Sequence, residues 1–331
     1  MQKRMESGRG IGISRVACLL AAACAIPIGS QTQSAHRAQA QDIGNPRTPL
    51  EETRYDDEAG WLHYTQSHSP KTLFQWSGAS GFEDGAIDEE RGPLVTDRPD
   101  FTESSSTVGR GVIQLEMGYT YTTDSSGGER LTAHSYPEAL LRVGVLAEWF
   151  EFRIAGNYAD ELTRTGGTRV TESGAEDLYV GLKLALTEQC GCLPEMALIP
   201  QMNVPIGSAA FTANRVLPGV NWTYSWEVSD FLSTGGQSQI NCVLDGVTDD
   251  EYVEFSQSWT LNYSLTDRLG AYTEWYALIP RDADTDGPQQ YADGGFTFLV
   301  NDNVQLDVRA GIGLNEAADD FFTGAGLSIR Y

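Results

Sequence analysis

The sequence predicts an all-β protein, an up-and-down antiparallel transmembrane β-barrel of about twelve strands. Apolar and polar residues alternate in many segments after residue 112, and short connections between these segments interleave with longer ones. Beyond the N-terminal 40 residues, no apolar run is long enough for a membrane helix. The organisation we expect is a signal peptide (1–40), a flexible acidic periplasmic arm (41–91), a signature segment that is a candidate plug or cap (92–111) and the barrel (112–331).

The N-terminus has the pattern of an export signal. Lys3 and Arg4 precede the apolar run VACLLAAACAIPIG, which is too short to span a membrane, and Ala38-Gln39-Ala40 offers a small-residue cleavage site. Residues 41–91 are polar and acidic, with scattered aromatics and no sustained period. Such a segment cannot bury enough apolar surface to fold alone, so we expect a flexible arm.

Strict alternation marks the predicted strands. Between Ile113 and Thr122 the odd positions are apolar or aromatic, and the even positions are polar or small. The same pattern recurs at 150–158, 178–186, 220–228, 254–263 and 304–313, and weaker runs begin near Pro137, Glu195, Phe231, Leu269, Tyr291 and Phe321. The total of about twelve is even, as bacterial barrels require.

The connections also alternate in length. We expect tight turns at 229–230, 266–268 and 301–303, and longer loops near Ser125, Thr165, Ala210, Asp249, Asp284 and Ala317. A membrane barrel has short turns at its periplasmic rim and longer loops outside. Pro200 removes a ladder donor inside an apparent strand, so we expect a bulge or local break there.

Periodicity alone does not say which face of the strands points inward. A soluble barrel turns its apolar face inward, whereas a membrane barrel turns it to lipid and has a polar lumen. Phe321 and Tyr331 lie ten residues apart on the apolar face of the last strand. At about 3.3 Å per residue and a tilt near 45°, they span roughly 24 Å, the height of the apolar band. This spacing favours the membrane arrangement over a soluble exported barrel that binds a ligand inside.

The polar face then supplies the candidate functional residues. As a selectivity lining they would filter solutes, and as a plug of ion pairs they would fill a narrow lumen. Both interpretations use the same charged side chains, and the sequence leaves both open. The signature segment and the strands contribute Asp97, Arg98, Asp100, Glu103, Glu116, Glu138, Arg142, Glu151, Arg153, Asp177, Lys183, Glu227, Glu254, Glu274, Asp307, Arg309 and Arg330.

Charge and residue chemistry exclude other classes of function. A formal net charge of -24 argues against nucleic acid as a partner, because phosphate binding needs a basic face. The only barrel histidine is His134, and Ser135 beside it must point to the opposite face of a strand. We therefore expect no enzyme of the outer-membrane phospholipase type.

A partial calcium-loop motif lies in one predicted external loop. Asp282, Asp284, Asp286 and Gly287 form D-x-D-x-D-G, and Asp293 stands where the last carboxylate belongs. An aspartate replaces the expected glutamate and Pro288 follows the glycine, so a solvated acidic loop is the default and a Ca²⁺ site the alternative. No other cofactor is expected.

The cysteines of the predicted mature chain cannot form a disulfide framework. They are Cys190, Cys192 and Cys242, an odd number. Free cysteines in a turn are the simpler interpretation of Cys190-Gly191-Cys192, and a local disulfide is the alternative.

Several stretches between Leu94 and Tyr331 resemble one known family. TDRPDFTES, followed by VIQLEMGYTY and later by EDLYVGLKL, is similar to the outer-membrane family labelled for the meta-pathway of phenol degradation. This resemblance implies an outer-membrane barrel that passes small hydrophobic or aromatic molecules. The last strand, ending at Tyr331, resembles the signal read by the barrel-assembly machinery. The expected partners are therefore this machinery, outer-membrane lipid and a small solute.

We therefore expect a passive channel in the bacterial outer membrane for small, apolar or aromatic solutes. A structural or surface-exposed barrel without a conducting pore is the alternative. In either case the signature segment would enter from the periplasmic side, where its charged residues reach the mouth of the lumen.

Overall fold

The computed structural model describes residues 72–74, 92–245, 248–281 and 287–331. The predicted signal peptide and nearly all of the arm lie outside this range and stay predictions. No helix among the described residues is long and apolar enough to cross a membrane. The described residues form thirteen strands: β1 (Ile113–Ser126), β2 (Glu129–Gly144), β3 (Phe150–Thr165), β4 (Thr168–Ala175), β5 (Leu178–Thr187), β6 (Glu195–Val204), β7 (Leu217–Ser229), β8 (Leu232–Leu244), β9 (Glu251–Ser264), β10 (Leu269–Arg281), β11 (Gln289–Asn301), β12 (Val304–Gly313) and β13 (Phe321–Arg330).

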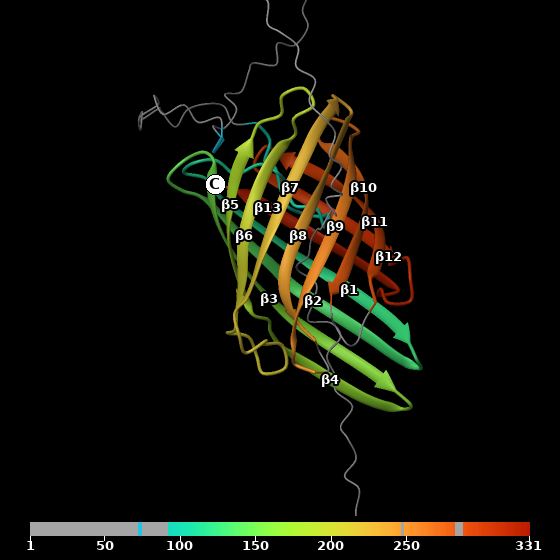
Figure 1. The fold of residues 1–331 in the computed structure, drawn as a ribbon. Helices are drawn as coiled ribbons and strands as arrows, with labels where there is room; N and C mark the ends of the chain where they lie inside the picture. Colours follow the sequence, from blue (N-terminus) through green and yellow to red (C-terminus); the bar gives the residue numbers. More distant parts are fainter. Residues whose placement is uncertain (1–71, 75–91, 246–247, 282–286) are drawn as a thin grey trace, which may run out of the picture. The chain divides into compact units, whose positions relative to one another are not determined.

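Twelve of these strands close into an antiparallel barrel (Figure 1). Neighbours in the chain pair with each other, and β13 returns to β1, where Arg330 lies opposite Gln114. The backbone N–H of Tyr331 donates to the Ile113 carbonyl at 2.8 Å and completes this seam. β4 pairs only with the C-terminal half of β3, residues 158–165. β5 pairs with the N-terminal part of β3, residues 150–155. The predicted barrel of about twelve strands is therefore confirmed, with β4 as an extension beyond the ring.

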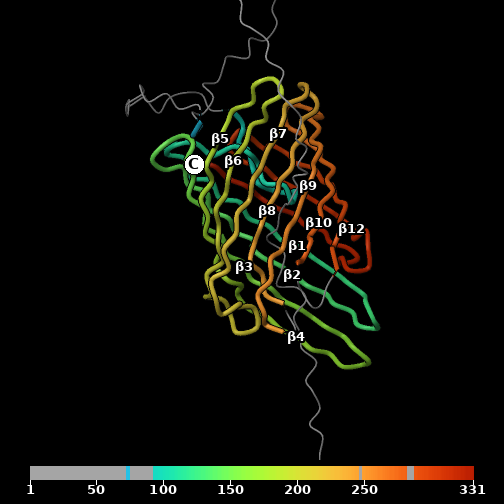
Figure 2. Tube along the Cα trace, in the orientation of Figure 1, coloured from blue at the N-terminus to red at the C-terminus, as the bar shows by residue number. Residues whose placement is uncertain are grey.

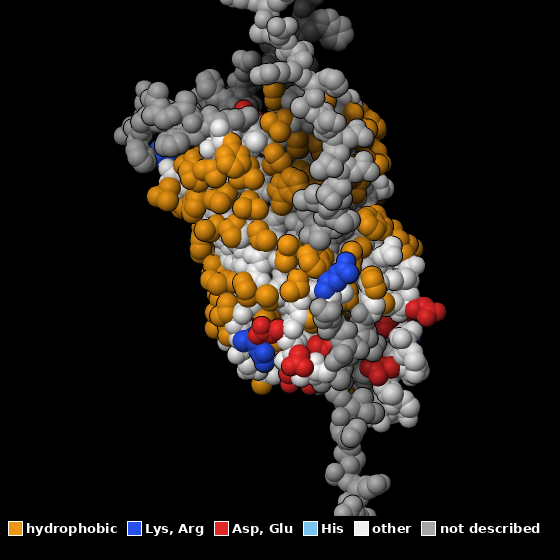
Figure 3. All heavy atoms as spheres, viewed as in Figure 1, with side chains coloured by type: hydrophobic (Ala, Val, Ile, Leu, Met, Phe, Trp, Pro, Cys, Tyr) orange, Lys and Arg blue, Asp and Glu red, His pale blue; other side chains and the backbone are white. Residues whose placement is uncertain are grey.

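The inner face of the barrel wall is polar and its outer face is apolar, as in a membrane barrel. Arg142, Glu151 and Lys183 face the lumen with 0% of their surface exposed. Figure 3 shows apolar side chains covering much of the outer wall, with charged ones gathered toward the end that carries the β3–β4 hairpin. This is the inverse of a soluble barrel. Large side chains exposed on the outer wall include Tyr119, Trp222, Trp259, Phe296 and Val308.

Two connections expected to be longer loops are tight glycine turns. Gly127–Gly128 joins β1 to β2 and Gly166–Gly167 joins β3 to β4, and all four glycines have positive φ between 55° and 90°. Two consecutive residues with positive φ form the type I′ turn that suits the twist of a hairpin. The prediction of longer loops near Ser125 and Thr165 was therefore wrong, because the strands continue past the ring. The longer connections 205–216 and 314–320 lie at this same rim, together with residues 245 and 248–250.

The local break expected at Pro200 is present, and an unexpected bulge lies in β2. The strand predicted to begin near Pro137 begins at Glu129, and its pairing with β1 and with β3 shifts by one residue around Pro137 and Glu138. Such a bulge redirects the strand, and it hid the earlier half of β2 from the alternation pattern. At Pro200 the ladder to β5 is broken locally, but its register is the same on both sides.

Residues 92–111, hereafter the luminal segment, precede β1 inside the ring of strands (Figure 2). The Leu94 N–H donates to the Asp302 carbonyl at 2.8 Å, in the turn between β11 and β12. At the other end, the Thr107 hydroxyl donates to the Glu148 carbonyl at 2.6 Å, in the β2–β3 connection. Between these two points the segment crosses the lumen and meets the polar face of the wall.

The assignment of faces predicts the effect of a charge on the outer wall. Val308 is 50% exposed near the middle of β12, so Val308→Arg should lower the free energy of unfolding by about 2–4 kcal/mol. Urea titration of the barrel in lipid vesicles measures this loss. Asp267→Arg, in the exposed β9–β10 turn, should change the value by less than about 1 kcal/mol. Equal effects of the two variants would contradict the assignment.

Candidate functional site

Asp97 of the luminal segment is the centre of a buried charge cluster. Its carboxylate lies 2.8 Å from Lys183 Nζ, 3.0 Å from Arg153 Nη1 and 3.3 Å from Arg142 Nη1. These cations come from β5, β3 and β2, and none is more than 2% exposed. Burial alone raises the pKa of Asp97, but the three positive charges outweigh it and hold the pKa below its ordinary value. Asp97 is therefore ionised and ties the segment to three strands.

Two wall carboxylates complete this cluster. Glu116 of β1 accepts from the Asp97 backbone N–H at 3.0 Å and from Arg142 Nη1 at 3.0 Å. Glu151 of β3 accepts from Arg142 Nε at 2.8 Å and from the Val108 N–H at 2.9 Å. Charges this deep in a narrow lumen are stable only when paired and hydrogen-bonded. The cluster therefore binds the luminal segment with charge-assisted bonds at both of its ends.

Arg98 makes a second attachment, to strands β2 and β12. Its Nη1 lies 2.7 Å from Glu138 Oε2, and its Nη2 lies 3.4 Å from Asp307 Oδ1. The guanidinium occupies the space that a Cβ would fill at Gly118 of β1 and Gly326 of β13, which are partners across that pair of strands. Two facing glycines thus leave room for one arginine of the segment.

The middle of the segment bonds to the remaining side of the barrel. Glu274 of β10 accepts from the backbone N–H groups of Phe101 at 2.6 Å and Thr102 at 2.8 Å. Gln237 of β8 donates to the Phe101 carbonyl at 2.7 Å and accepts from the Glu103 N–H at 3.0 Å. These pairs give the backbone of the segment the partners that a sheet would otherwise supply. The segment is therefore attached on all sides of the lumen.

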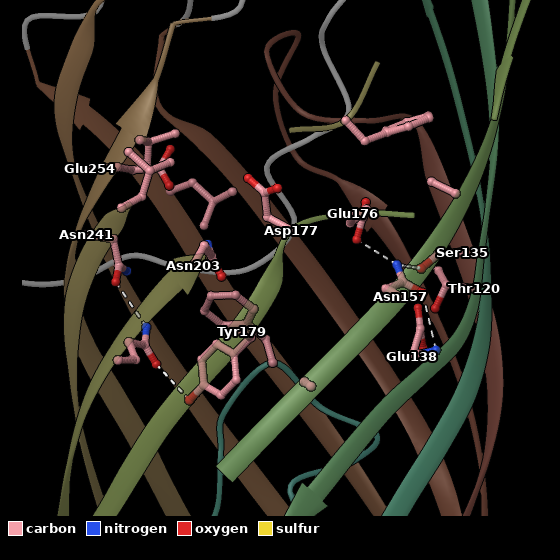
Figure 4. A pocket seen from close by; sticks show the side chains of 18 of the residues that line it. Thr120, Ser135, Glu138, Asn157, Glu176, Asp177, Tyr179, Asn203, Asn241 and Glu254 are labelled. Carbon is pink, nitrogen blue, oxygen red and sulfur yellow. Dashed lines mark hydrogen bonds between the residues drawn. The ribbon is translucent and has the colours of Figure 1, made fainter. Parts of the chain in front are cut away.

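A cavity of about 440 Å³ lies between the luminal segment and the rim that carries the longer connections. Asp97 to Phe101 line its floor, and side chains from most of the strands line its walls. Figure 4 shows Glu254 and Asn241 on one side of the cavity and Glu176 with Asn157 on the other, with Asp177 and Tyr179 between them. Asn157 Nδ2 donates to Glu176 Oε2 at 2.8 Å.

One wall of the cavity is a ladder of aromatic rings. Phe101 of the segment stacks on Tyr276 of β10 with centroids 4.4 Å apart, and Tyr276 stacks on Tyr291 of β11 at 4.7 Å. Tyr291 meets Phe322 of β13 edge-on at 6.2 Å. These are favourable ring geometries, and each ring has little exposed surface in a lumen that is otherwise polar. The cavity therefore offers an aromatic wall as well as an acidic one.

The sequence did not identify this ladder. Tyr276 shares the even positions of β10 with Glu274, and Phe322 shares those of β13 with Ser328, so parity alone would have placed both rings inside. A membrane barrel is expected to carry aromatic residues on its lipid face and charged ones in its lumen. That rule describes an average barrel and misses a lumen built to hold rings.

Most of the predicted lumen residues meet at the luminal segment, but some do not. Asp177 Oδ1 and Oδ2 accept from the N–H groups of Gly207 at 2.9 Å and Ala213 at 2.8 Å and order the 205–216 connection. Glu227 is exposed near a rim. Arg330 donates to Asn303 Oδ1 at 2.9 Å in a turn and to the Gly92 carbonyl at 2.8 Å, at the start of the luminal segment. Glu254 and Asp100 line the cavity. The predicted wall residues that contact the segment are Glu116, Glu138, Arg142, Glu151, Arg153, Lys183, Glu274, Asp307, Arg309 and Arg330.

The calcium alternative is still a prediction. Asp282, Asp284 and Asp286 lie outside the described residues. Asp293 lies in β11, where its Oδ2 accepts from the Tyr272 hydroxyl at 2.7 Å on the inner face. Among the described residues, no group of three or more His, Cys, Asp or Glu side chains could hold a metal ion.

His134 and Ser135 point to opposite sides of β2, as strand geometry requires. His134 Nδ1 is 2.7 Å from the Tyr119 hydroxyl, whereas the Ser135 hydroxyl accepts from Asn157 Nδ2 at 2.7 Å. The arrangement is not a Ser–His dyad. Cys190 and Cys192 are free and exposed in the β5–β6 connection, and Cys242 is free in β8.

Residues 96–331 match the protein family described as "Putative MetA-pathway of phenol degradation". The chain belongs to this family. The match begins at Thr96, so it includes most of the luminal segment as well as the barrel. No curated protein matches the chain.

Solved structures with the same fold are outer-membrane barrels. The chain is similar to an outer membrane channel from Pseudomonas putida F1, with a TM-score of 0.55 and 13% identity over 69% of this chain and 98% of that one. It is more distantly similar to the NanC porin (TM-score 0.41, 11% identity, 66% and 98% covered) and the KdgM porin (0.39, 9%, 65% and 98%). At these identities the likeness to the Pseudomonas channel shows the fold alone, that of an outer-membrane β-barrel.

Removal of the Asp97 carboxylate, the centre of the charge cluster, should destabilise the barrel. Asp97→Ala leaves three buried cations with fewer counter-charges and should lower the free energy of unfolding by about 3–5 kcal/mol. Urea titration in lipid vesicles measures the change. Asp267→Ala, in the exposed β9–β10 turn, should leave the value within about 0.5 kcal/mol of the parent. A loss at Asp97 no larger than at Asp267 would show that the cluster does not stabilise the barrel.

Proposed function

We propose that the protein is an outer-membrane channel for the passive uptake of small solutes with apolar or aromatic groups, and that its luminal segment constricts the pore. The cavity is the observation that supports this most directly. A volume of about 440 Å³ suits one small organic molecule, and the ring ladder gives it an apolar wall. The family and the fold shared with an outer membrane channel are consistent with this function.

In this proposal the charged residues of the lumen have two separate roles. Those around Asp97 and Arg98 fix the luminal segment, since they are paired with it at distances of 2.7–3.4 Å. Those above the segment, such as Glu254 and Glu176, line the route of the solute. The ion-pair interpretation and the selectivity interpretation thus apply to different levels of the same lumen. Passage then requires the segment to shift from the wall, and a concentration gradient is the only driving force.

A non-conducting structural barrel is the second candidate. It is favoured by the complete burial of Arg142, Lys183 and Glu151, because a lumen that is filled at one level needs no open state. The two candidates differ in whether the luminal segment ever leaves the wall. Electrical and flux measurements separate them.

Replacing the luminal segment tests the constriction. When residues 94–106 are exchanged for a Gly/Ser linker of equal length, single-channel conductance in planar bilayers should rise several-fold, because the cross-section now filled by the segment becomes water. Heat-modifiable migration on a denaturing gel verifies that the barrel has folded. Unchanged conductance in a folded barrel would refute the constricting role.

Solute flux tests the channel itself. Proteoliposomes with lipopolysaccharide in the outer leaflet should take up small aromatic solutes faster than protein-free vesicles, and faster still when they contain the linker variant. Heat-denatured protein reconstituted in the same way is the control. Silent bilayers at all voltages, together with no gain in uptake, would favour the structural barrel.

A further inference from the structure

We propose that the luminal cavity selects small organic cations that carry an aromatic or apolar group, such as arylalkyl ammonium ions. This inference rests on the proposed channel function and names the class of solute. It is derived from three features of the cavity: an excess of carboxylates without cationic partners, a buried carboxylate oxygen without a hydrogen-bond partner, and the ring ladder beside it.

The charge of the cavity wall is strongly negative. Among the described residues, eleven acidic side chains line the cavity and only three arginines do. Acids from loops far apart in the sequence converge on this one space, so the excess does not come from a single acidic loop. A cleft lined by one sign of charge between low-dielectric walls focuses its field and concentrates counter-ions. The acidic residues are Asp97, Asp100, Glu103, Glu138, Glu176, Asp177, Asp245, Asp249, Glu254, Asp293 and Asp319.

The arginines do not neutralise this excess. All three pair with acids at the floor: Arg153 with Asp97 and Glu103, and both Arg98 and Arg309 with Glu138. By contrast, six acids of the cavity form no salt bridge within 4.0 Å to any cation of the described chain: Asp100, Glu176, Asp177, Glu254, Asp293 and Asp319. The unpaired charge therefore faces the space that a solute would occupy.

The titration of two of these acids agrees with a shortage of positive charge. Burial, with the charge of Asp293 nearby, raises the pKa of Asp100 to about 8. Burial, with the charges of Asp124 and Asp320, raises the pKa of Asp319 to about 6. A cation in the cavity would favour the ionised form of both groups.

Asp293 is the residue most in need of a further partner. It is 9% exposed on the inner face of β11, where Oδ2 accepts from the Tyr272 hydroxyl and Oδ1 has no hydrogen-bond partner. A buried carboxylate oxygen without a donor is costly, and an ammonium group supplies both the donor and the opposite charge. Asp293 lines the cavity together with Tyr276 and Tyr291.

The ring ladder supplies the other half of the site. Aromatic rings pack against apolar groups and attract cations through their quadrupoles. Arg309 already lies over the Phe322 ring, with its guanidinium carbon 5.6 Å from the centroid, and its Nη1 donates to the Pro99 carbonyl at 2.9 Å. This end of the ladder thus holds a resident cation, and Phe101, Tyr276 and Tyr291 line the cavity beside Asp293. Aromatic carboxylates, which are similar in size, would be repelled by the acids.

Equilibrium binding to the full-length barrel in detergent tests this selectivity. Three probes of nearly equal size differ in charge: 2-phenylethylammonium, 2-phenylethanol and phenylacetate. Calorimetry at about pH 8, where Asp319 is ionised and Asp100 is about half ionised, with about 0.15 M salt, which screens exposed charges, should give the ammonium ion a Kd roughly tenfold lower than that of the alcohol. The carboxylate should bind more weakly than both. Equal affinities of ammonium ion and alcohol, or a preference for the carboxylate, would overturn the inference.

Two single variants locate the site. Asp293→Asn and Glu254→Gln should each reduce the preference for the ammonium ion over the alcohol several-fold, whereas Asp267→Asn in an exposed turn should preserve it. Heat-modifiable migration verifies folding, and either variant alone suffices if the other does not fold. A preference that both folded variants retain would overturn the assignment to this cavity. Binding is measured without transport, so a closed barrel that binds the ammonium ion contradicts the channel only, and an open channel without preference contradicts this inference only.

Discussion

The arrangement of this lumen depends on the pairing of Asp97 with Arg142, Arg153 and Lys183. Three cations on neighbouring strands would repel one another in a dry interior, and the wall carboxylates Glu116 and Glu151 alone do not reach all of them. The luminal segment supplies the missing negative charge from outside the sheet. Barrel and segment are therefore electrostatically interdependent, because neither set of buried charges is satisfied without the other.

The same dependence divides the lumen into two levels. At the level of Asp97 and Arg98, charges are matched and the segment fills the space that paired glycines leave open. Above it, acids are left without cationic partners and aromatic rings are stacked in their place. A filled, neutral level holds the segment, and an open, acidic level receives the solute. In the proposed function the first level restricts passage and the second determines which solutes approach it.

Much of the fold could be predicted from the sequence, because alternation reports directly which residues share a face of a strand. Strand β6 begins at Glu195, β10 at Leu269 and β13 at Phe321, as predicted. Alternation does not mark a strand whose two faces both meet water, as in the hairpins that end at Gly127–Gly128 and Gly166–Gly167, or a strand in which a bulge shifts the alternation by one residue, as at Pro137. It listed the lumen charges but could not pair them, because pairing depends on strand register and on the path of the luminal segment. The cavity and its ring ladder could not be predicted from the alternation for the same reason.

A reversible cross-link between segment and wall tests the central claim most directly. The hydroxyl oxygens of Ser105 and Ser225 lie 2.7 Å apart, so cysteines at both positions are within reach of a disulfide, in a background that lacks Cys190, Cys192 and Cys242. Planar bilayer recordings before and after addition of a reductant then compare the locked and the free segment in one molecule. The account predicts that the locked barrel is closed and that reduction restores conductance. Equal conductance in both states would contradict it, because solutes would then pass without movement of the luminal segment.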